Sequence, residues 1–171
     1  MKRLILVITL LTLISCVQHK EVLKVEKPAA PFVWEGANLY FLLTDRFNNG
    51  NLLNDVNFER TQEPGKLRGF EGGDIKGLTQ KIKSGYFTDL GINAIWLTPV
   101  VEQIHGATDE GTGISYGFHG YWARDWTALD PNFGTKEDLK RLVEEAHSKG
   151  IRIVLDGVIN HTGPVTNEDS V

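Results

Sequence analysis

Two short segments near the end of the chain carry side chains suited to holding a sugar. The first is the turn His119–Trp122, in which an imidazole, a glycine and two aromatic rings follow one another. The second follows an apolar run at 151–155 and contains Asp156, Asn160 and His161. Aromatic faces stack on sugar rings, and polar tips bind hydroxyl groups. We therefore predict that these two segments line a carbohydrate pocket.

Both segments also have a plainer interpretation. The aromatic rings of Trp122 and Trp126 can simply clamp a loop onto the core. Asn160 and His161 can end a strand and bond the loop backbone. On the residue types of Asn160 and His161 alone, this plainer interpretation is favoured.

A polar stretch at 48–55 concentrates Asn and Asp oxygens around Gly50, and residues 72–74 add two glycines and the carboxylate of Asp74. Ca²⁺ takes roughly six to eight oxygen ligands in an adaptable cage. The stretch can therefore be interpreted as a calcium loop. The alternative is a solvated Asn/Gly turn that binds nothing, and the composition of the loop alone favours that alternative.

The hydrophobic pattern predicts a scaffold of alternating strands and helices that positions these segments. Short apolar runs at 38–43, 92–97 and 151–155 predict strands, and the third, continuous and β-branched, is expected to be buried on both faces. Long loops are expected on either side of the second unit, up to about Asp74 and again between about 100 and 134.

Helical spacing predicts the two helices between these strands. Apolar residues recur at that spacing from Ile75 to Leu90. A second helix is expected to begin at Thr135, with Asp138 completing a capping box, and to be closed by Gly150. Strands separated by helices pair in parallel through right-handed crossovers.

Two architectures accept this order, a doubly wound sheet and an eight-stranded barrel. A dinucleotide fold would place Gly-x-Gly-x-x-Gly between the first strand and its helix, but the nearest match, at 111–117, has the wrong spacing and opens no helix. Long loops after strands favour the barrel, whose active face is built from them. We predict an α/β fold that forms the N-terminal portion, about three β/α units, of a TIM (β/α)8 barrel.

Residues 1–16 have the pattern of a lipoprotein-type signal peptide. Lys2-Arg3 precede an apolar run at 4–14, which is too short to span a bilayer, where a helix needs roughly 20 residues. The sequence 13–16, Leu-Ile-Ser-Cys, resembles a bacterial lipobox, so we expect lipidation at Cys16; an ordinary signal peptide is the alternative. Residues 17–35, polar and then proline-rich, are expected to form a tether before a domain at 36–171.

Charge and cysteine content narrow the classes of partner. A net charge of −4 gives no reason to expect nucleic acid or an anionic membrane surface as a partner. Cys16 is the single cysteine, which excludes an internal disulfide framework. Membrane association is therefore expected only through a lipid anchor.

From about Asn38 onward, the chain resembles the N-terminal part of an α-amylase-type catalytic domain, glycoside hydrolase family 13. It is most similar to the bacterial α-amylases and cyclodextrin glucanotransferases. Several motifs match in order over about 120 residues. They are Tyr40 with Thr44-Asp45-Arg46-Phe47, Gly72-Gly73-Asp74 with Gly77, Ile95-Trp96-Leu97-Thr98-Pro99-Val100, His119-Gly120-Tyr121-Trp122-Ala123-Arg124-Asp125, and Asp156 with Asn160-His161.

The resemblance implies roles for particular residues. Tyr121 would stack on the sugar beside the scissile bond, with Trp122 next to it, while His119 and His161 would face its hydroxyls and Asp156 would orient the site. Asn160 would bind a second calcium. Asn49 stands where many relatives have aspartate, which predicts a weaker first site. The expected ligands of that first, structural calcium are Asn49, Asn51, Asn54, Asp55, Gly72 and Asp74.

The activity implied by the family is retaining cleavage of α-1,4-glucosidic bonds in starch or maltodextrin by two carboxylates. The family takes these carboxylates from later strands, so no catalytic residue is expected here, and we expect a product truncated after its third strand that is inactive and aggregates or stays molten alone. The alternative is a non-catalytic surface lipoprotein that binds glucan or calcium, or an inactive gene fragment. The expected location is a bacterial membrane, at the outer membrane or cell surface.

Overall fold

The computed structural model describes residues 31–170, so the predictions for the leader, for Cys16 and for most of the tether lie outside the described residues. The chain divides between Val33 and Trp34 into two units, and the second, from Trp34 onward, contains all the helices and strands that follow. No helix within residues 31–170 combines the length and apolar character needed to cross a membrane.

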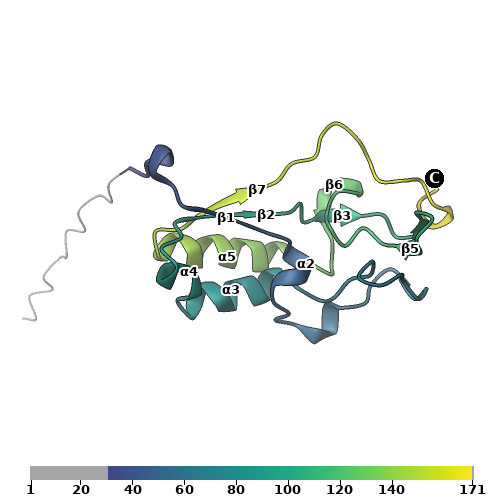
Figure 1. Ribbon diagram of the computed structural model, residues 1–171, viewed down its shortest axis with the longest axis horizontal. Coiled ribbons are helices and arrows are strands. Elements are labelled where there is room, and N and C mark those ends of the chain that lie inside the picture. Colours follow the sequence, from purple (N-terminus) through teal and green to yellow (C-terminus); the bar gives the residue numbers. More distant parts are fainter. Residues whose placement is uncertain (1–30, 171) are drawn as a thin grey trace, which may run out of the picture. The chain divides into compact units, whose positions relative to one another are not determined.

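Three parallel strands in the order β1-β2-β7 form the central sheet (Figure 1). Leu42 pairs with Leu97, which in turn pairs with Leu155, so the three strands end at the same edge of the sheet. The segments that follow the strands therefore leave from one edge. This confirms the predicted parallel pairing. The strands are β1 (Leu39–Leu42), β2 (Ala94–Leu97) and β7 (Arg152–Leu155).

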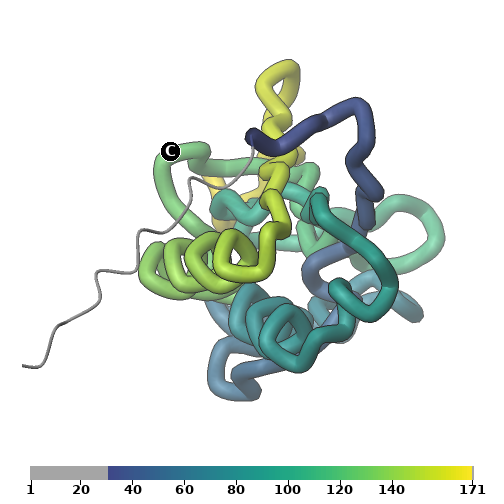
Figure 2. Tube along the Cα trace, turned by 90° about the vertical axis from the view of Figure 1, so that its left-hand side faces the viewer, coloured from purple at the N-terminus to yellow at the C-terminus, as the bar shows by residue number. Residues whose placement is uncertain are grey.

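The helices pack on one face of this sheet, with α3 and α5 side by side (Figures 1 and 2). The capping box of Thr135 and Asp138 is present at the start of α5, as predicted. The prediction of a single helix from Ile75 to Leu90 is wrong, because Gly85 has φ +89 and separates α3 from α4. The helices are α2 (Thr44–Phe47), α3 (Ile75–Lys83), α4 (Tyr86–Asp89) and α5 (Lys136–Ser148).

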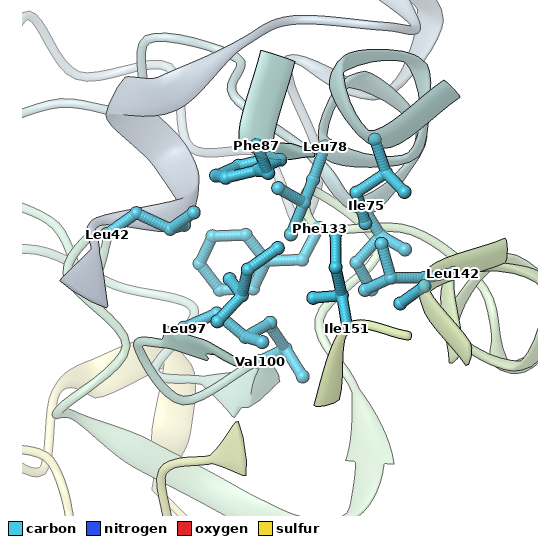
Figure 3. Packing of buried hydrophobic residues seen from close by; sticks show 12 residues of the cluster. Leu42, Ile75, Leu78, Phe87, Leu97, Val100, Phe133, Leu142 and Ile151 are labelled. Carbon is cyan, nitrogen blue, oxygen red and sulfur yellow. The ribbon is translucent and has the colours of Figure 1, made fainter. Parts of the chain in front are cut away.

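The core lies between the sheet and these helices, where the apolar faces of both meet (Figure 3). Each fully buried aliphatic or aromatic side chain contributes roughly 1.5–3 kcal/mol to stability. This layer therefore fixes the sheet edge from which the functional segments emerge. Its buried members include Leu42, Ile75, Leu78, Ile82, Phe87, Ile95, Leu97, Val100, Phe133, Leu142, Ala146 and Ile151.

The opposite face of the sheet is partly exposed, which contradicts the expectation that β7 is buried on both faces. Leu39 and Phe41 of β1 are each 49% exposed, and Trp96 of β2 is 36% exposed. The residues of β7 are half-buried or exposed on both sides: Val154 aligns with Phe41 and Trp96 and is half-buried, and Leu155 aligns with the core residues Leu42 and Leu97 and is 51% exposed. Within residues 31–170, β1 and β7 each pair with β2 alone, so both are edge strands of this sheet.

The region between about 100 and 134, expected to be a loop, contains two small antiparallel ladders. Both pairings are short, and the first has an irregular register. The alternation of apolar and polar residues that predicts a strand from sequence is therefore absent here. The paired strands are β3 (Val101–Gln103) with β6 (Ala123–Leu129), and β4 (Thr108–Asp109) with β5 (Ile114–Ser115); single 3-10 turns are η2 (Trp34–Gly36), η3 (Leu52–Asn54) and η4 (Asn167–Asp169).

Candidate functional site

Tyr121 joins the aromatic turn to the segment that follows β7. Its hydroxyl donates to Asp156 Oδ2 at 3.0 Å, and its carbonyl oxygen lies 3.1 Å from His161 Nε2. Its backbone N–H donates to His119 Nδ1 at 2.9 Å. The structure thus brings together His119, Tyr121, Asp156 and His161, four residues that the sequence placed in the sugar pocket.

The protonation of His119 follows from these contacts. Burial, the largest cause, lowers the pKa of His119 below its usual value, and this keeps the ring neutral near pH 7. Since Nδ1 accepts the N–H of Tyr121, the proton of the neutral ring sits on Nε2. His119 therefore offers Nε2–H as a donor, the group needed to bind a ligand hydroxyl.

The rings of the turn form a compact aromatic group. The rings of His119 and Tyr121 are 5.9 Å apart at an interplanar angle of 22°, and Trp122 meets His119 edge-on at 4.9 Å. Burial, followed by the hydrogen bond to Asp156, raises the pKa of Tyr121, which therefore stays a neutral donor. The predicted residue Trp122 belongs to this group.

A pocket of about 380 Å³ adjoins the turn and includes His119 and Trp122 in its wall. An ion pair between Arg68 and Glu110 joins the two loops that border it. The sequence pattern does not indicate Arg68 or Glu110 as site residues, because isolated charged residues in polar loops are typical of solvated surface. A larger pocket, about 430 Å³, lies beside Arg124 of β6 and contains none of the predicted residues.

The loop predicted to bind calcium holds two buried oxygens that have no hydrogen-bond partner. Asp74 Oδ1 caps α3 by accepting the N–H of Gly77 at 2.5 Å, and also that of Gly50 at 3.1 Å, whereas Asp74 Oδ2 is buried and unpartnered. Asn54 Oδ1 is likewise buried and unpartnered. Burial raises the pKa of Asp74. A bound cation would satisfy both oxygens and offset the cost of burying the carboxylate.

Four other predicted ligands, Asn49, Asn51, Asp55 and Gly72, contact one another in the same region of the chain. Asn49 Nδ2 donates to Asp55 Oδ1 at 2.9 Å, and the N–H of Asn51 donates to Asn49 Oδ1 at 3.1 Å. A Cβ atom on Gly72 would stand 2.2 Å from Asn49 Nδ2 and 2.7 Å from Asp55 Oδ1. A side chain at position 72 would therefore displace both of these groups, and the backbone of Gly72 lies against both side chains.

The donor set of this loop is one that suits a hard cation. It offers carboxylate, amide and carbonyl oxygens, the ligand types that Ca²⁺ prefers. Among residues 31–170, no group of three or more His, Cys, Asp or Glu side chains is placed to share a metal ion. Nearby, burial raises the pKa of Asp45 to about 6, and its carboxylate accepts the N–H of Glu71 at 3.0 Å.

Asn160, expected to bind a second calcium, is exposed on the segment after β7, and that role stays a prediction. The same segment is held by Trp126, whose Nε1–H donates to the carbonyl oxygen of Val158 at 2.6 Å. Trp126 thus acts as the loop clamp considered in the sequence analysis.

A parallel α/β sheet with an aromatic turn and polar side chains at its carboxyl edge is the arrangement in which (β/α) enzyme domains build their active sites. The family model described as "Alpha amylase, catalytic domain" matches residues 41–169. The chain therefore belongs to the α-amylase family of glycoside hydrolases.

Individual relatives agree with this membership. The periplasmic α-amylase of Escherichia coli K12 is 46% identical over 145 residues, covering 82% of this chain and 21% of the relative. The cyclomaltodextrin glucanotransferase of Geobacillus stearothermophilus is 40% identical over 129 residues, covering 75% of this chain and 18% of the relative. The chain thus spans about a fifth of the length of these relatives.

Among solved structures, the α-amylase of Geobacillus thermoleovorans in complex with acarbose is 38% identical, with a TM-score of 0.59. The match covers 78% of this chain and 25% of that one. The fold described above is therefore shared with a solved member of the family.

Proposed function

We propose that this chain supplies the first three β/α units and part of the glucan-binding site of an α-amylase-type (β/α)8 barrel. Its substrate would be an α-glucan such as starch or a maltooligosaccharide, cleaved at α-1,4-glucosidic bonds with retention. The observation that carries the proposal is the contact of Tyr121 with His119, Asp156 and His161 at the carboxyl edge of the sheet.

Each of these residues has a task in the proposed site. The ring of Tyr121 offers an apolar face for a glucose unit, and Asp156 holds that ring by accepting a hydrogen bond from its hydroxyl. His119 donates from Nε2, and His161 is tied to the turn through the carbonyl oxygen of Tyr121. The acarbose bound to the Geobacillus thermoleovorans relative supports a saccharide as the ligand.

The carboxylates of this chain are proposed to bind and position, and none is proposed as nucleophile or general acid. Asp156 accepts from Tyr121, Asp45 accepts backbone N–H groups at residues 71–72, and Asp74 caps α3. The carboxylates that break the glycosidic bond would come from later strands of the barrel. This assignment agrees with a match to about a fifth of each full-length relative.

The loop around Asp74 is proposed to bind a structural Ca²⁺. The support is the pair of buried, unpartnered oxygens on Asn54 and Asp74 and the close packing of Gly72 against Asn49 and Asp55. When bound, the ion would hold the loop between β1 and α3 in place; it would not activate water. Asn160 is proposed as a ligand of a second calcium.

The protein is proposed to be exported and anchored through Cys16 to a bacterial membrane. The support is the lipobox-like sequence at 13–16 and the periplasmic location stated for the Escherichia coli relative.

Isothermal titration of the chain with maltoheptaose tests the binding site. We expect saturable binding that Tyr121→Ala abolishes, because the stacking face is lost. Trp34→Ala serves as the matched control, since it removes an aromatic ring that is 55% exposed and outside the site. Equal affinity in the Tyr121→Ala variant and the unchanged chain would contradict the proposed site.

A further inference from the structure

A buried ion pair joins two parts of the chain that the sequence separates by 70 residues. Arg60 donates to both carboxylate oxygens of Asp130, at 3.1 and 2.8 Å, and their side chains are only 2% and 0% exposed. The guanidinium also lies over the rings of Phe58 and Phe70, at 4.9 and 4.6 Å. Buried ion pairs add little net stability but are costly to break, so this pair is best explained by what it positions.

Towards the cation loop, the ion pair continues through Asn132. Arg60 Nη1 donates to Asn132 Oδ1 at 2.5 Å. The side-chain Nδ2 of Asn132 donates to the backbone carbonyl oxygen of Asp55 at 2.7 Å. The backbone carbonyl oxygen of Asn132 accepts a hydrogen bond from Asn54 Nδ2 at 3.0 Å. Asn132 therefore hydrogen-bonds to two residues of the loop, Asp55 and Asn54. The Oδ1 atom of Asn54 is one of the two buried oxygens without a hydrogen-bond partner.

Towards the aromatic turn, the ion pair continues through Gln103. Asp130 Oδ2 accepts the N–H of Gln103 at 3.0 Å, and Arg60 Nη2 donates to the carbonyl oxygen of Ile104 at 3.0 Å. Gln103 is fully buried, and its Oε1 accepts the backbone N–H of Trp122 at 2.8 Å. Gln103 thus ties the turn, through its side chain, to the ion pair, through its backbone N–H.

We propose that the buried polar chain Asn132–Arg60–Asp130–Gln103 holds the aromatic turn in its glucan-binding position and couples it to occupancy of the cation loop. Arg60 and Gln103 are the positioning residues, and neither is placed against the saccharide. This inference rests on the proposed function, because the cation and the saccharide are both proposed there.

The chemistry of the network makes each member depend on the next. Burial leaves these polar groups no water to replace a lost partner, so a shift at one end leaves an unsatisfied group unless the neighbours move too. Arg60 uses a planar fork of donors to reach Asp130, Asn132 and two carbonyl oxygens. Lysine offers a single ammonium and cannot reproduce this fork.

Amide hydrogen exchange at Trp122, followed by NMR on the full 171-residue chain, tests the coupling. We expect saturating Ca²⁺ to slow exchange of the Trp122 amide by about tenfold, within the usual range of coupling between sites. Arg60→Lys should remove this effect while Ca²⁺ binding, measured by calorimetry, persists. Gln103→Leu should speed exchange at Trp122 with or without Ca²⁺ and weaken maltoheptaose binding.

Arg124→Met is the matched control, because Arg124 pairs with Glu102 and Asp169 outside the network and its loss should leave the Ca²⁺ effect intact. Ca²⁺ binding that leaves exchange at Trp122 unchanged in the unsubstituted chain overturns the coupling alone. The absence of any Ca²⁺ binding overturns the proposed cation site and the coupling together. Because both readings come from the unsubstituted chain, the test stands even if a variant fails to fold.

Discussion

At the scale of single residues, Tyr121 connects the parts of the candidate site. Its hydroxyl, N–H and carbonyl oxygen contact Asp156, His119 and His161 respectively. The hydroxyl contact restrains the ring and the two backbone contacts restrain the turn, which lowers the cost of ordering them when a sugar binds.

Removing the hydroxyl of Tyr121 should loosen this arrangement without removing the stacking face. We expect Tyr121→Phe to cost about 1 kcal/mol of unfolding free energy, the usual worth of one hydrogen bond, and to weaken maltoheptaose binding severalfold. Urea unfolding and calorimetry measure the two effects. Tyr116→Phe, which also loses a hydroxyl hydrogen bond but lies outside the group around Tyr121, should destabilise the chain and leave affinity unchanged. Equal affinity losses in both variants would show that the Tyr121 hydroxyl has no specific role.

The buried imidazole of His119 predicts a dependence on pH. Burial lowers its pKa in the folded chain, so below pH 6.5 the unfolded chain takes up the proton first. Its contribution to stability is therefore complete above pH 6.5 and is lost as the pH falls towards the folded pKa. NMR titration of the His119 ring should give a midpoint below 6.5, and His119→Gln should flatten stability over that range. A midpoint at or above 6.5 would contradict the buried, neutral ring.

At the scale of elements, the parts predicted correctly were those with a strong local signal. The parallel strands and α5 follow from continuous apolar runs and from the capping box at Thr135. The ladder of β3 with β6 was missed because bulges interrupt a three-residue strand. Arg60 and Asp130 are separated by 70 residues, and the local sequence around either residue does not predict their pairing.

The candidate site divides in the same way. Its polar tips could be predicted because they directly follow strands or form a recognisable motif, as Asp156 and the turn at His119 do. Arg68 and Glu110, which border the adjoining pocket, could not, because only folding brings their loops together. The half-buried state of β7 was mispredicted because its β-branched sequence suits a central strand, whereas one side of it has no partner among residues 31–170.

Gly72 lies in the loop between β1 and α3, close to the side chains of two predicted calcium ligands. Comparing alanine at Gly72 with alanine at Gly91 separates the effect of backbone strain from the effect of side-chain crowding. Gly72 has φ +88 and Gly91 has φ +71, so alanine at either position should cost about 1–2 kcal/mol in strain. Only at Gly72 would the new Cβ meet Asn49 and Asp55, whereas Gly91 has open space. We expect Gly72→Ala to weaken Ca²⁺ binding at least tenfold and Gly91→Ala to leave it unchanged, as measured by calorimetry. An unchanged affinity of the Gly72→Ala variant for Ca²⁺ would show that Gly72 is not part of the cation site.

At the scale of the whole described unit, the sheet has one face covered by helices and one face partly open. Phe41 and Trp96 lie on the open face with their ring centres 5.0 Å apart, and both are substantially exposed. In the proposed barrel this face would point inward and be covered by other strands. In the chain by itself it is an apolar surface beside two strand edges, an arrangement that favours association.

Sedimentation velocity tests that expectation. The chain should self-associate as concentration rises, and Phe41→Glu should shift it towards monomer by placing a charge on the open face. Leu53→Glu is the matched control. Leu53 is an apolar residue that is 93% exposed, but it lies in the cation loop and is not part of the open sheet face. Its substitution should therefore leave the association state unchanged. A chain that stays monomeric throughout would mean that the open face does not drive association.

The central claim is that the aromatic turn and the segment after β7 form one glucan-binding site. A structure of the chain with bound acarbose tests it most directly. We predict a sugar ring stacked on Tyr121, with its hydroxyls in hydrogen-bond contact with His119 and His161. Acarbose bound elsewhere, with these three side chains free of it, would contradict the account.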